Sequence, residues 1–330
     1  MSLAVHVLNL PYEHSLDELR ALLAPEIHLS GGEDVASDCA ILVAGYPLRA
    51  QILASASLRA LVIPWAGVPA PTRNLLLEIP QIAVHNLHFN AVPVAEMAIT
   101  LLLAAAKYII PSDRALRASD WTPRFRQPDP GVLVHGKTAL VLGYGAIGTR
   151  VARMCHGLGM RTRAVRRQVA GVGEPPVATD EGTLLYAPAA LSHLLPGADF
   201  VIVCLPLTPD TDGLLGAHEL GLLPSHAILV NVSRAEIVDE AALYHALRDG
   251  TVYAAGLDVW YANPGSESAS VGVAPSTYPF HELDNVVMSP HRAGHAHEVE
   301  QQRLGALADL LNHAARGQPM PNRVDVRAGY

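Results

Sequence analysis

Short apolar runs alternate with amphipathic stretches along most of the chain. In the first third, runs typical of buried strands cover residues 4–8, 40–44 and 60–63, and residues 15–23 place leucines on one helical face. A second series predicts a helix at residues 147–158 and strands at 138–142, 161–165, 200–205, 227–232, 254–259 and 286–288. Such alternation indicates parallel sheets covered by helices on both faces.

A chain of 330 residues suits two α/β domains of this kind. The leucine periodicity of residues 298–315 predicts a closing helix, which we expect to return to the first domain. One domain would then comprise residues 1–92 and 296–330, and the other residues 93–295. A long helix at 93–110 is so apolar that we expect it at a domain or subunit boundary.

Composition and charge narrow the class of protein. Half of the residues are hydrophobic and 16% are charged, which argues against disorder, and the net charge of −8 argues against a general nucleic-acid role. The first residues lack the basic start of a signal peptide, and the most apolar stretch, residues 97–110, is short for a membrane span. The three cysteines have no paired spacing. We therefore expect a cytoplasmic protein with neither a membrane nor a nucleic-acid partner.

A glycine-rich turn follows the strand at 138–142 and opens a helix. Gly143 permits a tight turn, Gly145 lets a backbone approach a pyrophosphate, and Gly148 allows close packing of helix and strand. With Ala146 and Ile147, this turn would offer the N–H groups of a helix N-terminus to phosphates. A purely structural turn is the alternative, but the strand and helix on either side favour dinucleotide binding.

The next strand ends without the acidic residue that accepts hydrogen bonds from an adenosine ribose. Arg166 and Arg167 stand there instead. Two guanidinium groups suit a 2′-phosphate, which they can bind bidentately. We therefore expect NADP to be favoured, with NAD still possible. The alternative is that both arginines are solvated surface charges.

Three later strands end in polar residues. Arg234 follows one strand, Asp258 ends a second, and His291 follows a third. Ligand-contacting loops of α/β sheets lie at such carboxyl ends. An arginine could orient a substrate carboxylate and polarise a carbonyl, while a histidine could donate a proton as hydride arrives. These positions predict a site for a carbonyl substrate that bears a carboxylate.

From about residue 63 onward, the order and wording of these motifs resemble the D-isomer-specific 2-hydroxyacid dehydrogenases. The matching segments are residues 90–96, 143–148, 204–209, 231–243, 256–259 and 289–294. The resemblance implies two doubly wound parallel-sheet domains, a Rossmann-type cofactor domain and a flavodoxin-like substrate domain. It also implies that Arg234 binds substrate, that His291 is the acid/base, and that the long helix contributes to a homodimer interface.

The same resemblance implies further contacts with substrate and cofactor. The substrate contacts would come from Ala66, Gly67, Val68 and Asn90. Beyond the glycine turn, the cofactor contacts would come from Leu205, Pro206, Val232, Ser233, Asp258 and Gly294.

Two departures from the family pattern stand near the histidine. Asn263 occupies the position where the family usually has a glutamate beside the catalytic histidine. An amide can orient the imidazole, but it stabilises the protonated ring less than a carboxylate does. Residues 265–273 resemble an insertion that carries Glu267. Either Glu267 or Glu282 could supply the missing charge.

The sequence thus predicts an NAD(P)-dependent oxidoreductase acting on a small 2-oxo or 2-hydroxy acid, such as glyoxylate or hydroxypyruvate. The alternative is a non-catalytic, dinucleotide-sensing regulatory protein of the same fold. Formate-type chemistry is a weaker alternative, because it rests only on the amide of Asn263. His291, His295 and His297 lie close together, but no cysteine or carboxylate completes a recognisable ligand set, so we expect no metal.

Overall fold

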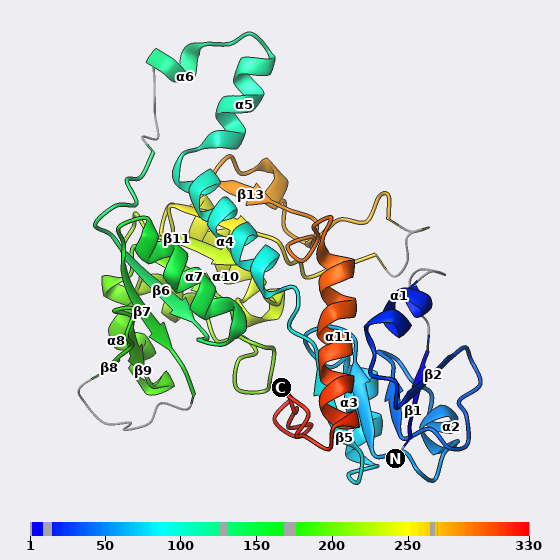
Figure 1. The fold of residues 1–330 in the computed structure, drawn as a ribbon. Coiled ribbons are helices and arrows are strands. Elements are labelled where there is room, and N and C mark those ends of the chain that lie inside the picture. The colour runs from blue at the N-terminus through cyan, green and yellow to red at the C-terminus, as the bar shows by residue number, and fades with distance from the viewer. Residues whose placement is uncertain are drawn as a thin grey trace. The chain divides into compact units, whose positions relative to one another are not determined.

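The computed structural model describes residues 2–8, 15–125, 131–167, 176–264, 268 and 270–329. The chain divides into two compact units (Figure 1). Unit 1 comprises Met1–Asn90 and His295–Tyr330, and unit 2 comprises Ala91–Gly294. The chain therefore passes from one unit to the other twice, after Asn90 and after Gly294.

Unit 1 is built on five parallel strands in the order β2-β1-β3-β4-β5. The strands are β1 (Leu3–Val7), β2 (Ile27–Gly31), β3 (Ile41–Val43), β4 (Ala60–Ile63) and β5 (Ala83–Asn86). The helices are α1 (Ser15–Leu22), α2 (Arg49–Leu53), α3 (Ala70–Leu77) and α11 (Val299–Ala315). This strand order is the flavodoxin-like one, as predicted.

Alternation along the strands divides the core of unit 1 into two layers. Ile41 and Val43 face a layer formed with α1 and α11, while Leu42 faces a layer formed with α2 and α3. The predicted strands at residues 4–8, 40–44 and 60–63 are confirmed to within a residue at each end. The sequence did not reveal β2, which is mostly exposed, or β5, which is short and ends in His85 and Asn86.

Unit 2 contains an eight-stranded sheet in the order β13-β12-β11-β10-β6-β7-β9-β8. Among the strands that the structure describes in this sheet, only β8 and β9 pair in antiparallel fashion. The strands are β6 (Thr138–Leu142), β7 (Arg161–Val165), β8 (Val177–Ala178), β9 (Leu184–Tyr186), β10 (Phe200–Val203), β11 (Ile228–Asn231), β12 (Ala254–Leu257) and β13 (Val286–Met288). The strand order reverses between β6 and β10, so this sheet is Rossmann-type and the predicted fold class is confirmed.

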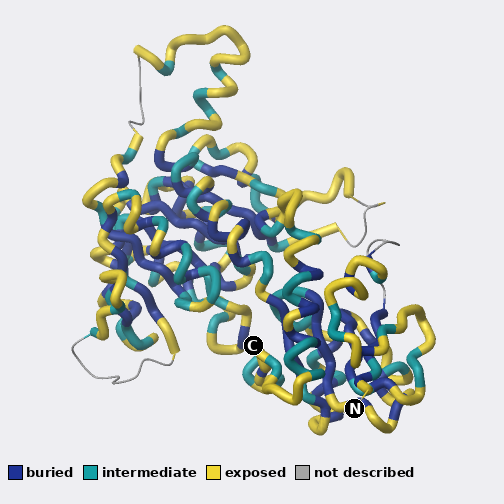
Figure 2. Tube along the Cα trace, viewed as in Figure 1, coloured by how far each residue is buried: buried dark blue, intermediate teal, exposed yellow. Residues whose placement is uncertain are grey.

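Helices cover both faces of the second sheet, and its strands are buried throughout the middle (Figure 2). One face packs against α4 (Ala91–Ala106) and α7 (Ala146–Gly157). The other packs against α8 (Leu191–Leu194), α9 (Ala217–Gly221) and α10 (Glu240–Arg248). Short 3₁₀ turns lie at Pro188–Ala190, Leu195–Gly197, Ala235–Ile237 and Phe280–Glu282.

The predicted long helix at residues 93–110 is in fact two helices. The first, α4, ends at Ala106, and α5 (Ile109–Arg117) begins after Tyr108, whose φ of 50° is left-handed. The two helices meet at 67°. Among the described residues no single helix is long and apolar enough to cross a membrane, although this bent pair passes by length and composition.

Burial also separates the two helices. Helix α4 is largely buried, whereas α5 and the short α6 (Thr122–Phe125) have no buried residue (Figure 2).

Candidate functional site

The glycine turn joins β6 to α7, and its three glycines meet different surroundings. Gly143 has a φ of 97°, and a Cβ there would lie 2.7 Å from the Cys204 carbonyl oxygen. A Cβ on Gly148 would overlap the Gly143 carbonyl oxygen. A Cβ on Gly145 would meet nothing within 4 Å. The protein's own packing therefore requires Gly143 and Gly148, while Gly145 leaves open space in which a phosphate group can approach the backbone.

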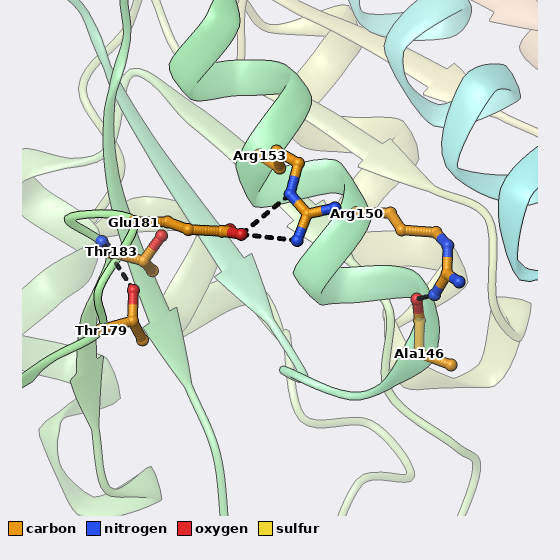
Figure 3. A network of polar contacts seen from close by, with 6 residues as sticks. All are labelled: Ala146, Arg150, Arg153, Thr179, Glu181 and Thr183. Atoms are coloured by element: carbon orange, nitrogen blue, oxygen red, sulfur yellow. Dashed lines mark hydrogen bonds and ion pairs between the residues drawn. The ribbon is translucent and has the colours of Figure 1, made fainter.

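Two arginines extend from α7 in different directions (Figure 3). Arg150 Nη1 donates to the Ala146 carbonyl oxygen at 2.6 Å, in the first turn of the helix. Arg153 donates through Nε and Nη2 to Glu181 Oε1, at 3.0 and 2.5 Å. Hydrogen bonding from Arg153 lowers the pKa of the exposed Glu181 carboxyl. Arg153 thus ties the β8–β9 turn to α7 and is engaged away from the glycine turn.

Arg166 and Arg167, the predicted readers of a 2′-phosphate, directly follow β7, and both are exposed. The Arg166 backbone N–H donates to the Tyr186 carbonyl oxygen at 2.9 Å, which continues the pairing of β7 with β9. The backbone is thereby fixed while the side chain lies at the surface. Residues 168–175 lie outside the described part of the chain.

The predicted cofactor loop at Leu205 and Pro206 follows β10, across the switch point from the glycine turn. Thr211 Oγ1 donates to the Pro206 carbonyl oxygen at 2.7 Å and accepts from the Thr208 N–H at 2.8 Å. This hydroxyl closes the loop on itself. Sequence reasoning did not single out Thr211, although a Thr-Pro turn with a second threonine three residues later was a possible signal.

Strand register places the arginine and histidine loops at one edge of the sheet. Asn231 at the end of β11 is paired with Leu257 of β12, and Leu257 is paired with Met288 of β13. The residues that follow these three positions therefore leave the sheet side by side.

The arginine loop is held by Asn231, which is 2% exposed. Its Nδ2 donates to the Arg234 carbonyl oxygen at 2.9 Å, and its Oδ1 accepts from the Ser233 N–H at 3.1 Å and hydroxyl at 3.0 Å. The Arg234 side chain is exposed, and its Nη1 donates to the Ser233 carbonyl oxygen at 2.7 Å. The backbone is thus locked while the guanidinium remains at the surface.

The histidine loop is held by Asp258, which is fully buried. Its carboxylate accepts from the Ser289 hydroxyl at 2.5 Å and from the backbone N–H groups of Arg292 and Ala293 at 3.0 and 2.8 Å. Hydrogen bonds to a charged acceptor are stronger than neutral ones. In the structure Asp258 therefore fixes the loop that carries His291, and its predicted contact with the cofactor stays a prediction.

His291 itself has a left-handed backbone, with a φ of 53°. Its N–H donates to the Ser289 carbonyl oxygen at 3.1 Å. A left-handed conformation is uncommon for a residue other than glycine, and such strain often occurs at functional sites. The bonds that Asp258 makes on both sides of His291 hold the backbone in this conformation.

Asn263 lies near the same loop but hydrogen-bonds within its own turn. Its Nδ2 donates to the Trp260 carbonyl oxygen at 3.1 Å, and Trp260 Nε1 donates to the Ser289 carbonyl oxygen at 2.8 Å. That Asn263 faces His291 stays a prediction. Glu267 lies outside the described residues, and the Glu282 side chain is 69% exposed, 4.0 Å from His281.

The predicted substrate residues Ala66, Gly67, Val68 and Asn90 belong to unit 1, whereas Arg234 and His291 belong to unit 2. Gly67 has a φ of 85° in the loop that follows β4. The Oδ1 atom of Asn90 is buried and has no hydrogen-bond partner in the described part of the chain. A buried polar atom of this kind usually binds a water or a ligand.

No group of three or more His, Cys, Asp or Glu residues among those described is arranged to hold a metal ion. His295 and His297 are exposed at the surface of unit 1.

Comparison with known proteins identifies the family to which this chain belongs. Residues 99–293 match the family model of the D-isomer specific 2-hydroxyacid dehydrogenase NAD binding domain. The chain belongs to the D-isomer specific 2-hydroxyacid dehydrogenases. The matched region contains the glycine turn, the arginine loop and the histidine loop.

Relatives of this chain include a glyoxylate reductase of Korarchaeum cryptofilum. The two are 35% identical over 235 residues, which cover 70% of this chain. A D-3-phosphoglycerate dehydrogenase of Archaeoglobus fulgidus is 34% identical over 72% of this chain. The matched stretch spans 65% of the first relative's length and 41% of the second's. A D-isomer specific 2-hydroxyacid dehydrogenase of Xanthobacter autotrophicus, solved with NADPH and MES, has a TM-score of 0.78 at 26% identity, with all of both chains covered.

Proposed function

We propose that this dehydrogenase is an NAD(P)H-dependent reductase of small 2-oxo acids similar to glyoxylate or hydroxypyruvate, reversible as a 2-hydroxyacid dehydrogenase. The observation that carries the proposal is the pair of locked loops at one sheet edge. Arg234 and His291 stand on loops whose backbones are fixed by the buried side chains Asn231 and Asp258. The names of the two relatives, a glyoxylate reductase and a D-3-phosphoglycerate dehydrogenase, support the same class of chemistry.

The chain offers a suitable site for the dinucleotide. The open space at Gly145 and the N-terminus of α7 would hold the pyrophosphate. When bound, the nicotinamide supplies or accepts the hydride. In this proposal unit 2 is the dinucleotide-binding domain and unit 1 the substrate domain. Further cofactor contacts would come from Ala146, Ile147, Leu205, Pro206, Val232, Ser233, Asp258 and Gly294.

The remaining chemistry would fall to the predicted substrate and acid/base residues. The Arg234 guanidinium would bind the substrate carboxylate through two N–H groups and polarise the neighbouring carbonyl. His291 would donate its proton to the carbonyl oxygen as the hydride arrives, and it would remove that proton in the reverse reaction. The Gly67 loop would bind the carboxylate through its N–H groups, and the buried Asn90 amide oxygen would accept a hydrogen bond from the substrate or a bridging water.

A substrate panel tests the proposal most directly. Purified protein is assayed with glyoxylate, hydroxypyruvate and larger 2-oxo acids, each with NADPH and with NADH. We expect turnover of at least one small acid. Tight binding of NADPH with no turnover of any acid would overturn the proposal and favour the dinucleotide-sensing alternative, to which the amide at Asn263 lends some support.

We also propose that NADP is the preferred cofactor, because Arg166 and Arg167 stand exposed where an acidic residue would select NAD. The NADPH bound to the Xanthobacter relative supports this preference. Replacing both arginines with serine should weaken NADPH binding by about 1–3 kcal/mol and leave NADH binding nearly unchanged. Equal affinities of the unmodified protein for the two cofactors, measured by calorimetry, would contradict it.

A homodimer is the third part of the proposal, and the segment that follows α4 would contribute to its interface. Helix α4 is largely buried within unit 2, whereas α5, α6 and the residues between them carry several exposed apolar side chains. These are Ile109, Ile110, Leu116, Trp121 and Phe125. Exposed apolar side chains gathered on one such segment are typical of an interaction surface. Sedimentation should show a dimer, and Leu116→Asp with Phe125→Asp should yield monomers; a monomeric unmodified protein would contradict the interface.

A further inference from the structure

The last residues of the chain cover an edge of the unit 1 sheet. Strand β5 is the edge strand at one side of this sheet, and residues 320–329, here called the C-terminal strap, run beside it. Arg323 forms an antiparallel bridge with His85, the Val324 N–H donates to the Val84 carbonyl oxygen at 2.8 Å, and the Asn86 N–H donates to the Asn322 carbonyl oxygen at 3.2 Å. Two backbone groups on this edge, the Val84 carbonyl oxygen and the Asn86 N–H, are thereby paired.

Side chains fasten the strap at two further places. The His85 imidazole donates from Nδ1 to the Pro321 carbonyl oxygen at 2.7 Å. Arg73 of α3 donates from Nε to the Val326 carbonyl oxygen at 3.0 Å and from Nη2 to the Arg327 carbonyl oxygen at 2.7 Å. Val324 is 6% exposed and packs in the core layer beneath α3. The strap is therefore part of the fold of unit 1.

Both fastening points adjoin the predicted substrate segments. Arg73 stands in α3, which begins directly after the loop at residues 66–68. Asn86 ends β5, from which the chain leads directly to Asn90. The Leu87 N–H donates to the Trp65 carbonyl oxygen at 3.3 Å, so these two substrate segments are also linked to each other. The strap thus holds α3, which follows the loop at residues 66–68, and β5, which precedes Asn90.

We propose that the C-terminal strap is a positioning element for the substrate-binding side of unit 1 and that it sets the KM for the 2-oxo acid. This rests on the proposed function. With the strap detached, β5 becomes an open edge strand, and the Gly67 loop and Asn90 sample more conformations. Substrate must then order them on binding, and this cost weakens binding. The dinucleotide, held by unit 2, does not bear that cost.

The test uses Arg73, whose side chain binds the strap and has no role in the proposed reaction. Arg73→Ala should raise the KM for glyoxylate about tenfold, while kcat and the Kd for NADPH stay within about twofold. Arg73→Lys, which keeps one donor, should recover part of the effect. Arg49→Ala is the matched control, because this exposed arginine of unit 1 forms an ion pair with Glu78, at the end of α3, and not with a residue of the strap. A chain ending at Pro319 should show a larger rise in KM.

Amide hydrogen exchange separates this proposal from the proposed function. Faster exchange at Gly67 and Leu87 in Arg73→Ala, with a raised KM, supports positioning. The proposal would be overturned if KM and amide exchange were unchanged in both Arg73→Ala and the chain ending at Pro319. It would also be overturned if Arg49→Ala raised KM as much as Arg73→Ala. If the unmodified protein turns over no acid, the proposed function fails, and the exchange of these two amides then decides whether the strap orders the loops.

Discussion

The arginine loop and the histidine loop leave the same sheet edge, yet they are held by opposite kinds of side chain. Asn231 is neutral, and it both donates and accepts within the three residues that follow it. Asp258 only accepts, and its three donors lie more than thirty residues further along the chain. One loop is a local turn, whereas the other exists only after β12 and the segment following β13 have come together.

This difference predicts unequal sensitivity to mutation. We call Asn231 the neutral clamp and Asp258 the charged clamp, because each side chain hydrogen-bonds the backbone of its loop. Loss of the neutral clamp leaves backbone groups unpaired, and each such group costs about 1–3 kcal/mol of stability when it is buried. Loss of the charged clamp leaves two backbone N–H groups and the Ser289 hydroxyl without their acceptor. The left-handed backbone at His291 is then no longer held in place. The arginine loop should therefore tolerate change better than the histidine loop.

The largest effect is expected where a loop loses the group it presents. Arg234→Lys keeps the positive charge and the Asn231 clamp but removes the planar pair of donors, so kcat/KM should fall by about two orders of magnitude or more. The Kd for NADPH and the thermal stability should change little. A variant with near-normal kcat/KM in steady-state assays would remove Arg234 from the site.

The next effect comes from the charged clamp. Asp258→Asn preserves shape but presents an N–H₂ group to neighbours that are themselves donors. The free energy of unfolding should fall by about 3 kcal/mol, and kcat should fall with it because His291 is no longer held. Urea denaturation and initial rates measure the two quantities. A stable variant with unchanged kcat would show that the loop keeps its conformation without the charge.

The neutral clamp should matter less. Asn231→Ala should lower the free energy of unfolding by about 1–2 kcal/mol, and its main kinetic effect should be on KM, because the Arg234 backbone loses its anchor. Urea denaturation together with KM for the 2-oxo acid measures this. If Asn231→Ala proves as damaging to stability as Asp258→Asn, the contrast between local and long-range clamps is wrong.

The smallest effect concerns the position where the family usually has a glutamate. If Asn263 faces His291, Asn263→Glu should help the imidazole keep its proton to higher pH. The reductive kcat/KM would then fall at a pH about one unit higher than in the unmodified protein. The measurement is kcat/KM against pH for both proteins. Superimposable profiles would place Asn263 elsewhere, or would mean that another carboxylate already serves this role.

The two clamps also show what could be predicted from the sequence. The glycine turn and the strands from β6 to β13 are coded within a few residues, and apart from β8 and β9 the sequence predicts the bounds of these strands to within two residues. The sequence predicts one helix through Tyr108, because hydrophobic periodicity does not report a single left-handed residue. The bonds of Asp258 and the strap on β5 were missed for another reason: they join segments far apart in the chain, which a local pattern cannot encode.

The glycine turn has a consequence for how this sequence can drift. Gly148 is constrained by the folded chain alone, so selection for a stable protein retains it whatever the protein does. Gly145 has open space beside it, so only a bound dinucleotide penalises a side chain there. In a lineage that kept the fold but abandoned the cofactor, Gly145 would be released from selection first, while Gly148 would persist. A descendant that keeps glycine at position 148 but not at position 145 would therefore record the loss of cofactor use before any other part of the fold had changed.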